Sequence, residues 1–85
     1  MSDLQKQFDT AAADSRKLNE RPDNDTLLKI YALYKQASAG DAEGSRPGFT
    51  DMVGRAKYDA WAKLKDLPRE DAMRQYVVLI DSLKG

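Results

Sequence analysis

The positions of proline and glycine divide this chain into four stretches, each about as long as a single helix. Among its 85 residues there are three prolines, Pro22, Pro47 and Pro68, and three of the five glycines lie between Gly40 and Thr50. The residue before a proline avoids helical backbone, and glycine together with proline is typical of loops. We therefore expect breaks near residue 22, across residues 40–50 and near residue 68.

Apolar side chains recur within each stretch at spacings of three and four residues, which places them on one face of a helix. The stripes consist of Leu4, Phe8, Ala11, Ser15 and Leu18; Leu27, Leu28, Ile30, Tyr31, Tyr34 and Ala37; Met52, Ala56, Ala60 and Leu64, with Trp61 beside them; and Ala72, Met73, Tyr76, Val77, Ile80 and Leu83. No stretch shows the alternation of a strand. We therefore predict an all-α protein, a four-helix bundle, that forms a single domain over residues 1–85.

Polar residues predict where these helices begin. Ser2 with Gln5 three residues later forms a capping box. The second helix follows Asp23-Asn24-Asp25, where short polar side chains can cap it and the acids favour its positive start. The third helix is expected from about residue 51 to residue 66, and the fourth begins after Pro68. Gly54 lies inside the third helix and costs roughly 1 kcal/mol there relative to alanine; the sequence alone does not explain it.

The composition argues against several functional classes. The chain has no cysteine and no histidine, so it lacks the side chains that most often act as nucleophile, general base or zinc ligand. Lysine plus arginine equals aspartate plus glutamate at 14 each, whereas nucleic-acid-binding proteins normally carry a basic excess. We therefore expect no catalytic residue, no metal site, no cofactor and no nucleic-acid partner.

No segment is suited to membrane insertion or export. The longest purely aliphatic run, Val77–Ile80, is far shorter than the roughly 20 residues that a membrane-spanning helix requires. The start of the chain, Met1–Gln5, has neither the basic residues nor the apolar core of a signal peptide. We expect a soluble, monomeric, cytoplasmic protein without stable membrane insertion and with at most transient contact with a membrane surface.

Aromatic and cationic side chains share helix faces. Tyr31 and Lys35 fall on one face of the second expected helix, Lys57 and Trp61 on one face of the third, and Arg16 follows the apolar stripe of the first. Brought together, they suit a ligand that carries an aromatic ring, phosphates and an apolar part. The same side chains can instead edge the core, with packed stems and solvated heads. Periodicity alone favours this second interpretation.

Five blocks of sequence occur in a specific order and spacing. They are Phe8-Asp9 with Ala11-Ala12 and Pro22; Tyr31-Ala32-Leu33-Tyr34-Lys35-Gln36-Ala37 with Gly40-Asp41; Arg46-Pro47-Gly48; Gly54-Arg55-Ala56-Lys57-Tyr58-Asp59-Ala60-Trp61; and Glu70-Asp71-Ala72-Met73 with Tyr76. Through them, essentially the whole chain resembles the acyl-coenzyme-A-binding protein (diazepam-binding inhibitor-like) family. The resemblance implies a four-helix bundle connected up-down-down-up that reversibly binds medium- and long-chain fatty acyl-CoA.

The resemblance also implies roles for individual residues. Tyr31, Lys35 and Lys57 should hold the ribose 3′-phosphate, and Tyr34 should pack against the adenine ring. Arg16 replaces a family lysine at the nucleotide end and keeps its charge. The path of the pantetheine and acyl chain should be lined by Phe8, Ala12, Leu27, Leu28 and Tyr76, and Ala32 and Leu33, which lie within the same signature, are also expected at the ligand.

Three residues depart from the family pattern. Val53 stands where many members have lysine, so we expect weaker binding or a shifted chain-length preference. Ser15 stands where an aliphatic residue is common, which slightly reduces the apolar surface beside the ligand. Asp66 replaces a common glycine at a helix end and should affect stability more than binding.

Together these expectations describe a carrier and buffer of acyl-CoA rather than an enzyme. Burying an acyl chain contributes about 0.8 kcal/mol per methylene, or roughly 8 kcal/mol for ten before ordering costs, whatever the head group. The phosphate and adenine contacts must therefore distinguish acyl-CoA from free fatty acid. The alternative is a helical protein-interaction module that keeps the fold and uses its aromatic groove for a partner helix. The mixed charge pattern disfavours a lipid-associating surface helix.

Overall fold

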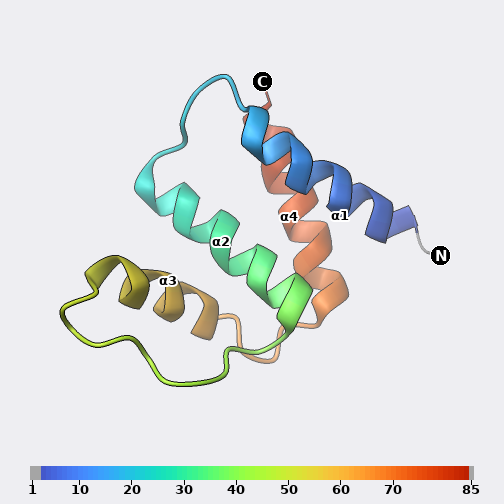
Figure 1. Ribbon diagram of the computed structural model, residues 1–85. Coiled ribbons are helices and arrows are strands. Elements are labelled where there is room, and N and C mark those ends of the chain that lie inside the picture. Colours follow the sequence, from blue (N-terminus) through green and yellow to red (C-terminus); the bar gives the residue numbers. More distant parts are fainter. Residues whose placement is uncertain (1–2, 85) are drawn as a thin grey trace.

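The computed structural model describes residues 3–84, which are mainly helical (Figure 1). The elements are α1 (Asp3–Asp14), a short 3₁₀ helix η1 (Ser15–Lys17), α2 (Asn24–Ala39), α3 (Met52–Ala62) and α4 (Arg69–Leu83). Residues 3–84 contain no strand, which confirms the all-α prediction. The capping box predicted at Ser2 lies outside the described residues. In this part of the chain, no helix is both long and apolar enough to cross a membrane.

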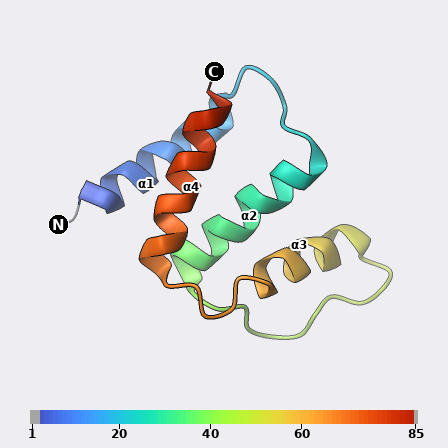
Figure 2. The ribbon, with the colours of Figure 1, turned by 180° about the vertical axis from the view of Figure 1, so that it is seen from behind.

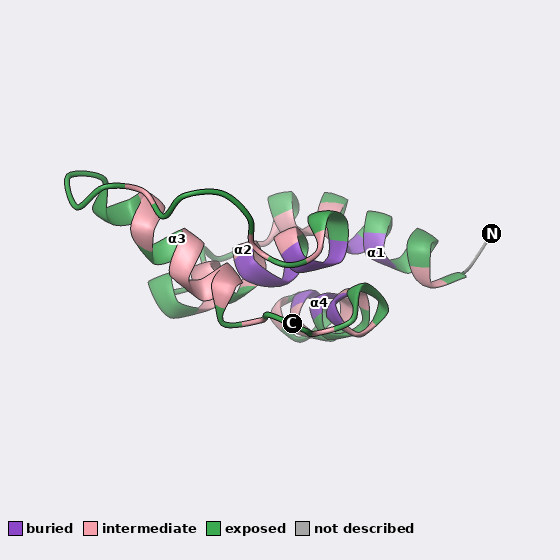
Figure 3. Cartoon of the chain, turned by 90° about the horizontal axis from the view of Figure 1, so that it is seen from below, coloured by how far each residue is buried: buried purple, intermediate pink, exposed green. Residues whose placement is uncertain are grey.

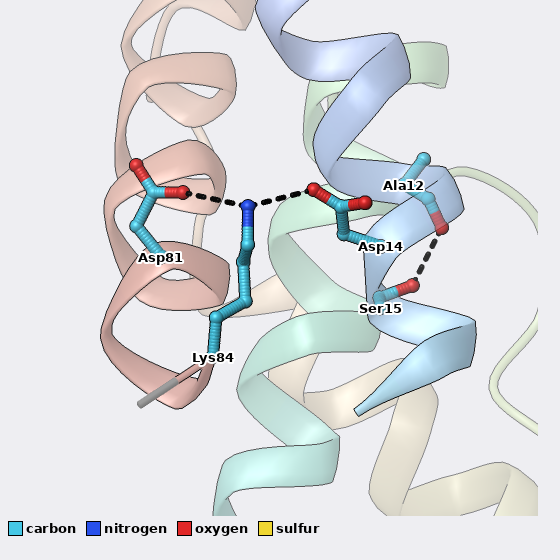
Figure 4. Close-up of polar contacts among 5 residues, drawn as sticks. All are labelled: Ala12, Asp14, Ser15, Asp81 and Lys84. Carbon is cyan, nitrogen blue, oxygen red and sulfur yellow. Dashed lines mark hydrogen bonds and ion pairs between the residues drawn. The ribbon is translucent and has the colours of Figure 1, made fainter. Parts of the chain in front are cut away.

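Contacts at the helix ends establish the direction of each helix. The ammonium group of Lys84, just after α4, lies 2.9 Å from a carboxylate oxygen of Asp14 at the end of α1, so these two helices run in parallel (Figure 4). The guanidinium group of Arg69, at the start of α4, donates to the carbonyls of Ala37 and Ser38 at the end of α2, so α2 and α4 are antiparallel. Helices α2 and α3 run side by side in the same direction (Figures 1 and 2). The connection is up-down-down-up, as predicted.

The core is formed by α1, α2 and α4, and α3 lies outside it. Helix α4 packs against both α1 and α2, whereas α3 packs against α2. The main buried cluster consists of Phe8, Ala11, Leu33, Ala37, Ala72, Tyr76 and Ile80. All of these except Leu33 belong to the predicted stripes. Helix α3 contributes no buried residue and shows only the intermediate and exposed colours in Figure 3. The fold is a plate of 37 × 30 × 15 Å with α3 along one edge (Figures 1 and 2).

Aspartates cap the two middle helices. The carboxylate of Asp23 accepts the N–H of Thr26 at 2.8 Å, which confirms the predicted start of α2. The carboxylate of Asp51 accepts the N–H of Gly54 at 2.9 Å at the start of α3. A Cβ atom at position 54 would collide with that carboxylate. The structure thus explains Gly54, because glycine leaves room for the cap.

The connection between α2 and α3, residues 40–51, is long because two parallel helices need a return path along their length. Side chains of α3 fasten this connection to the helix. The indole N–H of Trp61 donates to the carbonyl of Gly40 at 2.8 Å, and the hydroxyl of Tyr58 donates to the carbonyl of Gly44 at 3.0 Å. Arg46 makes two hydrogen bonds to the carboxylate of Asp59, of 2.8 and 2.7 Å.

A buried amide ties both connections of α3 to the end of α2. Gln36 is only 1 % exposed. Its amide nitrogen donates to the carboxylate of Asp41 and to the carbonyl of Leu67, both at 2.8 Å. The N–H of Asp66 donates to the same oxygen of Asp41 at 2.9 Å. The carboxylate of Asp41 therefore joins the start of one connection to the end of the other.

Helix α3 is shorter than predicted. We expected it to continue to Asp66, but the helix ends at Ala62 and residues 63–66 form turns. Backbone N–H groups there donate to the carbonyl three residues earlier instead of four, as Leu64 does to Trp61 at 3.0 Å. The φ angle of Asp66 is +73°, and no other residue except glycine has a positive φ in the described chain.

Replacing Asp66 by glycine should stabilise the protein. Glycine adopts a positive φ without a Cβ clash, so we expect the free energy of unfolding to rise by about 0.5–1 kcal/mol. The N–H that bonds to Asp41 is kept. Urea denaturation provides the measurement, and the Asp66→Ala variant, which retains a Cβ, should show no gain. A glycine variant no more stable than the parent would contradict the expected strain.

Protonation of Asp41 should weaken the fold in acid. The bond from the Gln36 amide, and then that from the Asp66 N–H, hold the pKa of Asp41 below its ordinary value of 3.8. Such a carboxylate stabilises the folded state above the unfolded pKa, and this contribution is lost as the pH falls through the folded pKa. Asp41→Asn keeps an acceptor oxygen but does not titrate. It should be less stable than the parent at neutral pH.

The difference in the free energy of unfolding between Asp41→Asn and the parent should shrink as the pH falls below about 4. It should be lost once the pH has passed through the folded pKa of Asp41, because both proteins then carry an uncharged side chain at this position. Urea denaturation at neutral pH and in acid measures it, and the other carboxyl groups titrate equally in both proteins. A stability difference that is the same at every pH would show that the charge of Asp41 is not involved.

Candidate functional site

A groove of about 770 Å³ runs along α2, between the end of α1 and the start of α3. It is lined by Ala12, Ser15, Arg16, Arg21, Asn24, Leu27, Leu28, Ile30, Tyr31, Tyr34, Met52, Val53, Ala56, Lys57 and Tyr76. Three of these residues are cations and none is an acid. Since acids and bases are equal in number over the whole chain, the groove is a local site of positive charge beside an apolar surface.

Helix α2 presents two different faces. Leu33 and Ala37 belong to the buried core, whereas Leu27, Leu28 and Tyr31 line the groove and are half-buried. The sequence predicted one broad apolar face on this helix, and the structure divides it. Most of the predicted face forms the wall of the groove, so these side chains are available to a ligand.

Aromatic rings from α2 and α4 line the groove, and a third ring, from α1, packs behind them. The ring of Phe8 lies 5.5 Å from that of Tyr34 and 5.1 Å from that of Tyr76, measured between centroids. Tyr76 is only 2 % exposed, and its burial raises the pKa of its hydroxyl, which the hydroxyl of Ser15 opposes. At neutral pH the Tyr76 hydroxyl is therefore an uncharged hydrogen-bonding group. The hydroxyl of Ser15 donates to the carbonyl of Ala12 at 2.7 Å (Figure 4).

Two cation–π contacts join α2 to α3, one helical turn apart. The ammonium group of Lys57 lies 5.3 Å from the ring centroid of Tyr31, and that of Lys35 lies 4.9 Å from the ring centroid of Trp61. In the first contact α3 supplies the cation, and in the second α2 does. The shared faces found in the sequence thus meet, as expected for parallel helices with both pairs spaced by four residues.

Eight of the twelve predicted site residues line the groove: Arg16, Tyr31, Tyr34, Lys57, Tyr76, Ala12, Leu27 and Leu28. The structure does not bring the other four to it. Phe8 is buried behind Tyr34 and Tyr76, and Ala32 and Leu33 are buried as well. Lys35 lies over Trp61 on the far side of the Tyr31–Lys57 contact. None of these four residues forms the surface of the groove, and Phe8 packs against two rings that do.

The groove also contains residues that were not among the predicted site. Met52 and Ala56 have the periodicity of a core stripe, which does not distinguish a core face from the wall of a groove. Arg21 comes from the connection between η1 and α2, whose path no sequence pattern defines, and Asn24 is the first residue of α2. Val53 and Ser15 could have been included, because the sequence already showed both as departures from the family pattern.

The groove combines cationic and aromatic side chains with an apolar wall. Its ionisable groups are three cations and three tyrosines, with no carboxylate to accept a proton. Among residues 3–84, no cluster of three or more acidic side chains could hold a metal ion. The arrangement suits a molecule with an anionic, aromatic portion and an apolar portion.

Comparison with known proteins identifies the family. The family model described as acyl CoA binding protein matches residues 5–80. The chain belongs to this family. It is 51 % identical over 81 residues to an acyl-CoA-binding protein homolog of Manduca sexta, which covers 94 % of this chain and 90 % of the relative. It is 46 % identical over 76 residues to acyl-CoA-binding protein homolog 1 of Caenorhabditis elegans, with coverage of 89 % and 88 %.

Solved structures of acyl-CoA-binding proteins have the same fold. The crystal structure of Oryza sativa acyl-CoA-binding protein 2 has a TM-score of 0.90 at 34 % identity and covers 94 % of this chain and 87 % of that one. The solution structure of the yeast acyl coenzyme A binding protein has a TM-score of 0.73 at 42 % identity, with coverage of 89 % and 88 %. The predicted family and bundle are both confirmed.

In this member of the family, Lys35 should contribute more to stability than Lys57, because it contacts a tryptophan and is half-buried. Lys35→Ala should lower the free energy of unfolding by about 0.5–1 kcal/mol, and Lys57→Ala by less. Lys35→Met keeps the aliphatic stem and separates packing from charge. Urea denaturation compares the variants; a Lys35→Met protein as stable as the parent would exclude a contribution from the cation–π contact.

Proposed function

We propose that the groove reversibly binds medium- to long-chain fatty acyl-CoA and that the protein is a carrier and buffer of these esters. The observation that carries the proposal is the combination of three cations, no carboxylate and an apolar wall in one groove of a chain with zero net charge. The names of the relatives, which are acyl-CoA-binding proteins, support it.

The head group is assigned to the contact between α2 and α3. Lys57 lies over the ring of Tyr31, so an ammonium group and a phenol hydroxyl on neighbouring helices can share the ribose 3′-phosphate. Tyr34 is 40 % exposed and offers a ring face to the adenine. Arg16 lines the groove on the side of α1 and supplies a further positive charge.

Lys35 remains a proposed third ligand of the 3′-phosphate, although it does not line the groove. It lies one helical turn from Tyr31 on α2, where its four-carbon stem allows the ammonium group to move. Binding phosphate would require it to leave the ring of Trp61. We therefore expect Lys35 to contribute less to affinity than Lys57, whose contact with Tyr31 is already part of the groove.

The pantetheine and acyl chain are assigned to the apolar wall. Ala12, Leu27 and Leu28 line it, and Tyr76 forms its buried floor, with Phe8 packed behind. At about 0.8 kcal/mol per methylene, this surface supplies most of the binding free energy but no selectivity for the head group. The protein needs no catalytic group, because a carrier only has to shield the thioester. We propose a monomeric cytoplasmic carrier with transient contact with membranes.

The 3′-phosphate should be recognised through Lys57. In calorimetry with palmitoyl-CoA, the parent should show saturable binding. Removal of the 3′-phosphate from the ligand should lower the affinity by about 10- to 100-fold, because charge-assisted hydrogen bonds are lost. Lys57→Ala should bind the complete ligand more weakly and should distinguish the two ligands much less. If the affinity losses caused by Lys57→Ala and by removal of the 3′-phosphate are not additive, Lys57 is the partner of that phosphate.

The matched control is Lys63→Ala, which removes a cation from the end of α3 outside the groove and should leave both affinities unchanged. Equal affinity of the parent for both ligands would refute the assignment of the phosphate. Absence of saturable palmitoyl-CoA binding would refute the carrier and leave a protein-interaction module that retains the fold.

A further inference from the structure

An exposed apolar cluster, Phe49, Met52 and Val53, lies at the start of α3. These side chains are 79, 78 and 70 % exposed. Single exposed apolar residues are common on soluble proteins, but contiguous ones mark surfaces that interact. Five large apolar side chains are exposed among the described residues, and the three most exposed of them fall within residues 49–53. Of the other two, Val78, at 68 %, stands alone on α4, and Tyr34 is only 40 % exposed.

The exposed cluster is continuous with the groove. Met52 and Val53 line the groove, whereas Phe49 does not and stands three residues before Met52. The segment lies along the outer edge of the plate, since α3 packs against α2 and not the core (Figure 1). Large exposed apolar side chains therefore stand at one end of the apolar wall, where that wall meets solvent.

The charges around the exposed cluster are mostly positive. Arg55 and Lys57 follow it, and Asp51 is the single acid between residues 44 and 57. Arg46 precedes the cluster, but its charge is paired with the carboxylate of Asp59 in α3. The carboxylate of Asp51 accepts the N–H of Gly54 and so points at its own helix. Apolar side chains flanked by long cationic ones are typical of surfaces that insert into the interface of a bilayer, where the cations reach the lipid phosphates.

We propose that Phe49, Met52 and Val53 form a docking surface for a lipid bilayer, which rests on the proposed binding of acyl-CoA. The acyl chain that the groove would hold is itself membrane-soluble, and docking by this edge places the apolar end of the groove against the bilayer. The chain then moves between membrane and groove without full exposure to water. Three side chains and zero net charge give weak, reversible docking, as a carrier requires.

Phe49→Ser is the informative variant, because Phe49 belongs to the exposed cluster but does not line the groove. Sedimentation with vesicles of phosphatidylcholine and phosphatidylglycerol, without acyl-CoA, measures docking. We expect Phe49→Ser to partition about five- to tenfold more weakly than the parent, since an aromatic ring no longer enters the interface. Val78→Ser, which removes a similarly exposed side chain from α4, is the matched control and should partition as the parent does.

Palmitoyl-CoA titration without vesicles should give the same affinity for the parent, Phe49→Ser and Val78→Ser. This separates the two hypotheses, since a loss of vesicle binding with intact acyl-CoA affinity concerns docking alone. Equal partitioning of Phe49→Ser and the parent, or a parent that does not bind vesicles, would overturn the docking surface. So would a concentration-dependent dimer of the parent that Phe49→Ser abolishes, because the exposed cluster would then be covered by a second copy.

Discussion

The buried amide of Gln36 is the contact on which the rest of the structure depends. It joins the end of α2 to Asp41 in one connection and to Leu67 in the other, and Asp41 in turn accepts the N–H of Asp66. One of these connections precedes α3 and the other follows it, and α3 has no buried residue of its own. Hydrogen bonds at its two ends, together with the cation–π contacts to α2, therefore hold in place the helix that forms one wall of the groove.

Much of the fold could be predicted from the sequence, because helix stripes, caps and prolines are local signals. The cap of α2 around Asp23 and the boundary at Pro68 were found, because a capping carboxylate and a missing N–H act on the nearest residues. The early end of α3 was not found. The residues that follow Ala62 form turns, and the N–H of Asp66 at their end bonds to Asp41, which is 25 residues away in the sequence. Such a contact leaves no periodic pattern.

The site could be predicted only in part for a similar reason. Periodicity shows that Tyr31 and Lys35 share a face, but it does not show that one side chain lines the groove while the other packs over Trp61. It also does not separate the two faces of α2, because Leu33 in the core and Leu28 in the groove are equally apolar. The family blocks supplied the residues of the site, and the packing of α2 between α3 and α4 decides which of them a ligand can reach.

The position of α3 outside the core has a consequence for how such a protein can diverge. A substitution in a core helix must preserve packing as well as function, and most such changes bring the protein closer to its stability threshold. The side chains that α3 presents to the groove, Val53 among them, are largely exposed and carry no such packing requirement. Substitutions in this one helix can therefore change which ligands the groove accepts while α1, α2 and α4 stay unaltered. Selection on ligand preference and selection on folding then act on different helices.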